Sequence, residues 1–298
     1  MTVTVTGATG LVGNHLTRAL LEAGHTVRAL ARKKSGSLPA AVRFFPWEAG
    51  QSEPPAESLE NVDAIVHLAG EPVAQRWTPE ARQRIRASRV DGTRHLVNTL
   101  STISRRPPAL ISASAIGIYG DRGNQILTEQ SSPGGDFLAQ LVVDWEQASL
   151  LAESLGMRVV PLRFGLILAS DGGALKKMLP PFRFGVGGRL GSGRQWNSWI
   201  HIDDVVHLIL FALARPDLRG PINAVAPNPV TNADFTKTLA ATLHRPAIFP
   251  VPKLALRLLF GEMSSVLLAS QRVLPESALA AGFTFRYAQL RAAFDRLL

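Results

Sequence analysis

The chain has 298 residues, of which 46% are hydrophobic, and a formal net charge of +9. This length suits one large α/β domain, or one such domain with a smaller partner. The absence of cysteine excludes disulfides, thiolate metal sites and thiol nucleophiles. No apolar run is long enough to span a membrane, and no basic segment precedes an apolar one at the N-terminus. We therefore expect no membrane association and a cytoplasmic location.

The positive charge leaves three alternatives open: a nucleic-acid partner, a phosphate-bearing ligand, or solubility alone. Basic residues are spread from Arg18 to Arg296, and no stretch interleaves them with aromatic residues. An RNA-binding function therefore rests on net charge alone, and we do not expect a nucleic-acid partner.

Short β-branched runs alternate with helical patterns over the first 168 residues. The predicted helices are 11–23, 82–101 and 136–148. The predicted strands are 3–5 with its flanks, 26–32, 42–47, 63–70, 109–117 and 157–168. This alternation predicts an α/β fold with a Rossmann-type, doubly wound parallel sheet.

The pattern changes after Leu168. Residues 171–198 contain seven glycines and are expected to be rich in loops, whereas 199–213 reads as a strand followed by a helix. A further strand is expected at 221–227, and the chain from Thr231 onward is mostly helical in pattern. We predict a Rossmann domain over 1–168, with its sheet completed by 199–227. A smaller, mostly helical substrate lobe is predicted over 169–198 and 228–298.

Three glycines, Gly7, Gly10 and Gly13, follow the first strand and open the first helix. Glycine at these positions permits a tight turn, close approach of backbone amides to a pyrophosphate, and close packing of helix on strand. An ordinary glycine-rich turn is the alternative. The position at the first strand–helix turn favours a dinucleotide-binding site.

The second strand ends in basic residues, Arg32 and Lys33. A site that prefers NAD usually has an acidic residue there to bind the ribose 2′-hydroxyl, whereas basic residues accommodate a 2′-phosphate. NADP is therefore predicted in preference to NAD. The alternative is that both side chains are simply solvated.

Four motifs resemble the extended short-chain dehydrogenases/reductases of the NAD-dependent epimerase/dehydratase superfamily. They are TGATGLVG (6–13), HLAG (67–70), SASAIGIYG (112–120) and WIHIDD (199–204). Segments 70–77, 88–94, 171–204 and 267–287 further resemble a sugar-nucleotide-epimerase-like branch that has its own C-terminal domain of unknown function. The resemblance covers essentially the whole chain, and it implies the fold and the cofactor more firmly than the reaction.

The resemblance assigns a role to individual residues. It implies that Arg32 contacts the 2′-phosphate and that Ser114 is the catalytic serine. Arg89 stands where relatives often carry asparagine, so it either reaches the cofactor or is a surface arginine. The pyrophosphate loop and the strand end that passes the adenosine are implied at Gly7, Thr9, Gly10, Leu11, Val12 and Gly13, and at Leu68, Ala69 and Gly70.

Glu71 and Tyr119 are further candidates. Glu71 ends a strand at the carboxyl edge of the sheet, where ligands bind in open α/β folds. It is a candidate for binding cofactor or substrate. Tyr119 follows the strand that carries Ser114, and it is either catalytic or structural.

The Tyr-x-x-x-Lys pair that usually transfers the proton in this superfamily is missing. The chain has only Tyr119 and Tyr287, and the residues four positions later are Gly123 and Arg291. Aligning Glu146 with the glutamate that often follows the lysine places Leu138 and Val142 in the two positions. Asp144 and Glu146 are then expected to be surface or bracing carboxylates.

Two classes of function remain. One is an NADP-dependent oxidoreductase or epimerase acting on a small, anionic or sugar-like hydroxyl or carbonyl compound. The other is an NADP-binding sensor or scaffold with little turnover. No metal site is expected, because the seven histidines show no ligand spacing. An anionic-substrate site is expected from the basic residues Lys176, Lys177, Arg183, Arg189 and Arg194.

Overall fold

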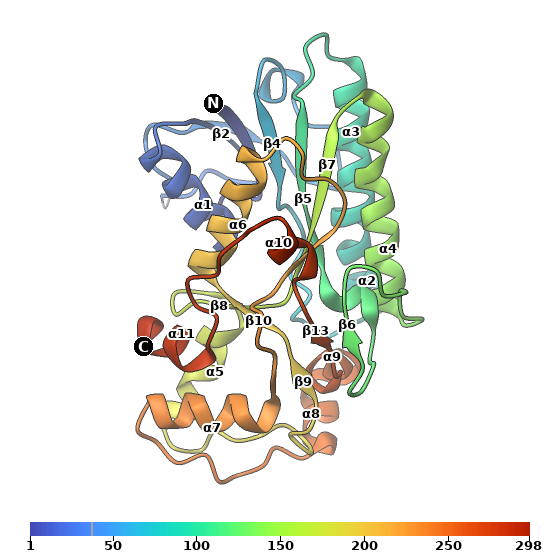
Figure 1. The fold of residues 1–298 in the computed structure, drawn as a ribbon. Coiled ribbons are helices and arrows are strands. Elements are labelled where there is room, and N and C mark those ends of the chain that lie inside the picture. The colour runs from blue at the N-terminus through green and yellow to red at the C-terminus, as the bar shows by residue number, and fades with distance from the viewer. Residues whose placement is uncertain (37) are drawn as a thin grey trace.

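A computed structural model describes residues 1–36 and 38–298. Its centre is a seven-stranded, wholly parallel sheet with the strand order β11-β7-β5-β4-β1-β2-β3 (Figure 1). The order runs outward in both directions from β1 and β4, which is the doubly wound arrangement predicted from the sequence. The strands are β1 (Thr2–Thr6), β2 (Thr26–Ala31), β3 (Arg43–Pro46), β4 (Ala64–His67), β5 (Ala109–Ala115), β7 (Arg158–Phe164) and β11 (Ile222–Ala224).

Helices cover both faces of the sheet. Helix α1 packs beside α6 on one face, and α3 packs beside α4 on the other. Leu16 and Leu20 of α1 lie one helical turn apart and are fully buried in one cluster with Val3 and Val5 of β1. The helices are α1 (Leu11–Glu22), α3 (Gly92–Thr102), α4 (Phe137–Leu150) and α6 (Ile202–Ala214).

The helix predicted over 82–101 is interrupted. It consists of α2 (Pro79–Arg86), one π-helical turn (Ala87–Asp91) and α3. Such turns are frequent at functional sites because they redirect side chains. Here the turn presents Ser88 and Arg89 to the end of β4: the Glu71 amide donates to Ser88 Oγ, and Arg89 donates to the Glu71 carbonyl.

The strand predicted over 157–168 is also interrupted. It leaves the main sheet at Gly165 and continues as β8 (Leu166–Leu168), which pairs with β10 (Trp199–His201). A Cβ on Gly165 would lie 2.5 Å from the Ser198 carbonyl oxygen, so the crossing of these segments requires glycine.

The expectation of a loop-rich 171–198 was wrong for residues 173–183. Helix α5 (Gly173–Arg183) forms there, because Leu175 and Leu179 lie one turn apart and bury together. Two prolines in its second half do not prevent it.

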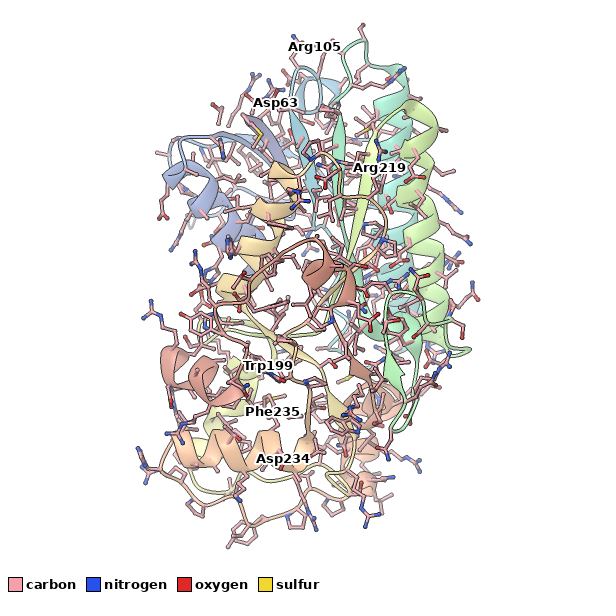
Figure 2. All side chains as sticks on the ribbon, in the orientation of Figure 1. Asp63, Arg105, Trp199, Arg219, Asp234 and Phe235 are labelled. Atoms are coloured by element: carbon pink, nitrogen blue, oxygen red, sulfur yellow. The ribbon has the colours of Figure 1, made fainter. Side chains whose placement is uncertain are left out.

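A second lobe, largely helical as predicted, lies below the sheet (Figure 1). Its interior contains Trp199 and Phe235, which Figure 2 places between β10 and α7, together with Phe294. Among the described residues, no helix is long and apolar enough to cross a membrane. The remaining helices and strands are α7 (Asn232–Thr242), α8 (Lys253–Phe260), α9 (Ser264–Leu268), α10 (Glu276–Ala280), α11 (Leu290–Leu297), β6 (Ile126–Leu127), β9 (Trp196–Asn197), β12 (Val230–Thr231) and β13 (Arg272–Val273).

Candidate dinucleotide site and reaction cavity

A cavity of about 1400 Å³ extends from the first turn of α1 to α8 and α9 of the second lobe. Small-molecule sites usually occupy about 300–1,000 Å³, so there is room for a dinucleotide and a second molecule. Nine of the residues predicted from the sequence line it: Gly7, Gly10, Leu11, Val12, Gly13, Leu68, Gly70, Arg89 and Ser114.

The glycine loop at one end of the cavity has no space for side chains. Gly7 has a φ of +66°, and a Cβ there would meet the backbone of Leu68 at 2.8 Å. A Cβ on Gly13 would lie 2.3 Å from the Gly7 carbonyl oxygen. Gly10 is the N-cap of α1 and supplies no side-chain cap, so the N-terminal amides of the helix face the cavity. The loop therefore fits a pyrophosphate group.

A buried hydrogen-bonded chain, Thr6–His67–Thr93, holds the neighbouring strand ends; we call it the neutral network. Thr93 Oγ1 donates to the Arg89 carbonyl, so it accepts from His67 Nε2 at 3.0 Å. His67 Nδ1 then accepts from Thr6 Oγ1 at 2.8 Å, and Thr6 Oγ1 itself accepts from the amides of Leu68 and Ala69. Burial lowers the pKa of His67 to about 4, which keeps the ring uncharged.

Two arginines lie near the end of β4. The Arg89 guanidinium faces Gly70 and lies 5.2 Å from the Trp145 ring; burial lowers its pKa to about 10, against the opposing effect of Glu71. Arg32 is exposed, and its Nη1 lies 3.8 Å from Glu71 Oε2. Lys33 is exposed beside it, as is Thr9 in the glycine loop. The positive charge needed for a 2′-phosphate is thus present at the end of β2.

A second buried chain, Ser114–Glu146–Arg163, lies behind the cavity wall at the end of β5; we call it the charged network. Ser114 Oγ, on the cavity wall, donates to Glu146 Oε1 at 2.5 Å. Arg163 binds both carboxylate oxygens of Glu146 at 2.8 Å. Burial opposes the charge of Arg163, but the bonds and charge of Glu146 outweigh it, so the pKa of Arg163 is raised. The Ser114 hydroxyl proton is therefore committed to a carboxylate.

Tyr119 belongs to the same buried region and is absent from the described cavity wall. Its hydroxyl donates to Asn223 Oδ1 at 2.7 Å and accepts from Arg163 Nη1 at 2.9 Å. Burial raises its pKa. This geometry favours the structural alternative for Tyr119 over proton transfer to a ligand.

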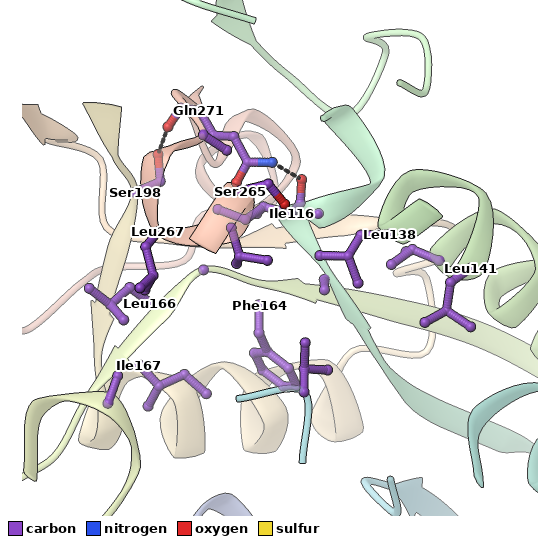
Figure 3. Close-up of a pocket in the computed structure, with 18 of the residues that line it drawn as sticks. Ile116, Leu138, Leu141, Phe164, Leu166, Ile167, Ser198, Ser265, Leu267 and Gln271 are labelled. Atoms are coloured by element: carbon purple, nitrogen blue, oxygen red, sulfur yellow. Dashed lines mark hydrogen bonds between the residues drawn. The ribbon is translucent and has the colours of Figure 1, made fainter. Parts of the chain in front are cut away.

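Leu138 and Val142 both line the cavity, near Gly117 and one turn apart on α4. Figure 3 shows Leu138 on the wall with Leu141 and Ile116. The two positions that the alignment on Glu146 assigned to tyrosine and lysine are therefore apolar wall. Of the two acidic residues of α4, Glu146 braces Ser114, whereas Asp144 pairs with Arg86 of α2.

Several wall and network residues went unrecognised in the sequence. Arg163 carries a detectable signal, because an arginine within the apolar run Val159–Phe164 of β7 requires a buried partner. Lys253 and Arg257 of α8 line the far end of the cavity, although nothing in the sequence links them to it. In the described part of the chain, the wall contains none of the five basic residues expected there: Lys176, Lys177, Arg183, Arg189 and Arg194.

His201, from the WIHIDD motif, lies outside the described cavity wall. His201 caps α6 through Nδ1 and stacks on Tyr287, so it braces the second lobe. No cluster of potential metal ligands occurs among the residues that the structure describes.

These observations define a Rossmann-type nucleotide-binding protein whose cavity has room for a second molecule. The family model for the NAD dependent epimerase/dehydratase family matches residues 3–225, and a domain of unknown function (DUF1731) matches residues 251–297. The chain belongs to this epimerase/dehydratase family. It is similar to the epimerase family protein YfhF of Bacillus subtilis, with 38% identity over all of this chain and 98% of the relative.

Solved structures show the same similarity. The human epimerase family protein SDR39U1 (isoform 2), crystallised with NADPH, superimposes with a TM-score of 0.90 and 33% identity, covering 100% of this chain and 99% of that one. The nucleoside-diphosphate sugar epimerase of Corynebacterium glutamicum has a TM-score of 0.80 and 39% identity, covering 100% of this chain and 58% of that one.

Proposed function

We propose that the chain binds NADP(H) and acts as an oxidoreductase or epimerase on a small hydroxyl or carbonyl compound. The glycine loop would hold the pyrophosphate, and Arg32 the 2′-phosphate. Thr9, Lys33, Ala69 and Glu71 remain proposed cofactor contacts. The NADPH present in the human relative supports this choice of cofactor. When bound, the cofactor supplies hydride transfer.

The observation that carries the proposal is the bond from Ser114 to Glu146. A serine whose proton is donated to a carboxylate has only lone pairs left for a ligand, so it accepts a hydrogen bond from a substrate hydroxyl. As the carbon loses hydride, the hydroxyl proton would pass to Ser114 Oγ while the serine proton passes to Glu146. Arg163 opposes the last transfer, because it stabilises the ionised carboxylate. This relay predicts slow turnover compared with a tyrosine–lysine pair.

Deuterium transfer tests the proposal. The protein would be incubated with NADPH deuterated at C4 and a panel of aldehydes and ketones, and the products analysed by mass spectrometry. Transfer above the protein-free background is expected, and Ser114→Ala should reduce it by at least about 100-fold. Ser112→Ala is the matched control, because Ser112 lies on the same strand but donates to the Ala113 carbonyl.

An NADP-binding sensor or scaffold is the second candidate, favoured by the apolar residues at Leu138 and Val142. Tight NADPH binding without deuterium transfer to any panel member would support this candidate and contradict the first. Failure to bind NADPH would contradict both.

A further inference from the structure

We propose that the second ligand of the cavity is an amphipathic anion: an apolar body lying along α4, β8 and α9, with its anionic head at Lys253 and Arg257. This inference rests on the proposed function, because it names the class of compound that would share the cavity with NADP(H). It departs from the sugar nucleotide that the name of one relative suggests.

The wall beyond the glycine loop is largely apolar. Figure 3 shows Leu138, Leu141, Phe164, Leu166, Ile167 and Leu267 around one space. Burying apolar surface against such a wall stabilises a complex by about 25 cal/mol per Å². A hydroxyl-rich sugar would gain little of this, and it would lose hydrogen bonds to water.

Most polar side chains on this wall already bond to the protein itself. Ser198 Oγ donates to the Gln271 carbonyl and accepts from the Val273 amide. Gln271 Nε2 donates to the carbonyls of Ile116 and Gly120, as Figure 3 shows for Ile116.

Two serines of the second lobe behave in the same way. Ser264 and Ser265 donate to the carbonyls of Gly261 and Glu262. A sugar hydroxyl would therefore find few free donors, which is the pattern expected of a site for an apolar body.

Charge on the wall is also unevenly distributed. Of its four basic residues, Arg82 pairs with Glu262, and Arg89 is held by the carbonyls of Glu71 and Ile85. Lys253 and Arg257 are the other two. Neither side chain has a hydrogen bond or ion pair within the described ranges, although the Arg257 backbone carbonyl accepts from the Gly261 amide.

Lys253 and Arg257 are placed to act together. They are four residues apart, so they lie on one face of α8, and both line the cavity. Leu256, between them in sequence, is buried and anchors the helix. Two unpaired cations at the end of an apolar channel complement one anionic head group.

Binding of single-chain probes to the NADPH-loaded protein tests the inference, by calorimetry with every probe kept below its micelle concentration. Decanoate should bind more tightly than decanol, which has a similar apolar chain without charge, and more tightly than UDP-glucose. Decyl phosphate distinguishes a phosphate head from a carboxylate head. Tighter binding of UDP-glucose, or equal binding of decanol and decanoate, would overturn the inference.

A variant pair locates the head group. Lys253→Met/Arg257→Met should weaken decanoate about tenfold and leave decanol and NADPH binding within about twofold. Lys237→Met/Arg245→Met is the control, because it removes equal charge from the same lobe at residues that line a different, smaller pocket. An equal loss in both double variants would overturn the assignment. If decanoate does not bind although NADPH binds and deuterium is transferred, only this inference is contradicted. If NADPH does not bind, the proposed function is contradicted.

Discussion

Two regions of the cavity, the glycine loop and the surroundings of Ser114, are supported in opposite ways. The neutral network of Thr6, His67 and Thr93 fixes the backbone beside the glycine loop without introducing charge. The charged network places a full ion pair, Glu146 and Arg163, behind a single wall hydroxyl. The comparison teaches that the glycine loop depends on backbone positions, whereas the surroundings of Ser114 depend on a few side chains whose charges must balance.

Among the variants that test this comparison, removal of Arg163 should cause the largest loss of unfolding free energy. Arg163→Met would leave Glu146 buried and unpaired, which costs about 3–5 kcal/mol of unfolding free energy. Urea denaturation measures it. Arg291→Met removes half of an exposed pair with Asp295 and should cost less than about 1 kcal/mol. If the two variants lose equal stability, the charged network does not stabilise the fold as described.

Protonating His67 of the neutral network should cause the next largest loss of unfolding free energy. The unfolded chain binds a proton at His67 near pH 6.5, whereas the folded chain does so only near 4. The stability is therefore fully present above pH 6.5 and is lost as the pH falls toward 4, by about 3 kcal/mol. The pKa of His201 is also lowered to about 4, so it adds to the same window.

His67→Asn should remove the contribution of His67 to this pH dependence and leave that of His201. The measurement is the unfolding free energy at pH 7.5 and at pH 4.5. His244 is exposed and has a positive φ that asparagine tolerates, so His244→Asn should leave the pH dependence unchanged. An unaltered dependence in His67→Asn would show that other groups cause the acid loss.

Adding a methyl group to the glycine loop tests whether this region depends on its backbone positions. Gly13→Ala should cost about 1–3 kcal/mol of stability through overpacking, and weaken NADPH binding more than decanoate binding. Gly135→Ala meets no atom within 4 Å and should change neither. A Gly13→Ala variant with normal NADPH affinity would exclude this loop as the pyrophosphate site.

Reversing one surface charge should give the smallest effect. Arg32→Glu should weaken NADPH about tenfold, or about 1.4 kcal/mol, and change NADH little, because NADH lacks the 2′-phosphate. Fluorescence titration of both nucleotides measures the ratio. Lys34→Glu, also at an exposed position, is the control. An equal loss for NADH would contradict the assignment of Arg32.

The sequence predicts the glycine loop better than the surroundings of Ser114, for a physical reason. Gly7, Gly10 and Gly13 are local in sequence, and Gly7 and Gly13 are required by a backbone conformation or a close approach that only glycine allows. The bond between Ser114 and Glu146 joins residues 32 positions apart on different elements, so no local pattern encodes it.

Two further features also depend on segments that are distant in the sequence. The exit of the chain at Gly165 depends on Ser198 and Val225, which approach only in the fold. The free cations of α8 reach the cavity through the arrangement of the second lobe. The absence of the tyrosine–lysine pair, by contrast, was readable in full from the sequence.

The commitment of the Ser114 proton to Glu146 also affects the redox balance of a bound pair. A wall oxygen that only accepts hydrogen bonds stabilises an alcohol, which can donate one, and offers nothing to the oxygen of a ketone or aldehyde. The equilibrium between the two ligands on the protein should therefore lie further toward the alcohol than it does in water. The chain would retain the reduced compound and release the oxidised one.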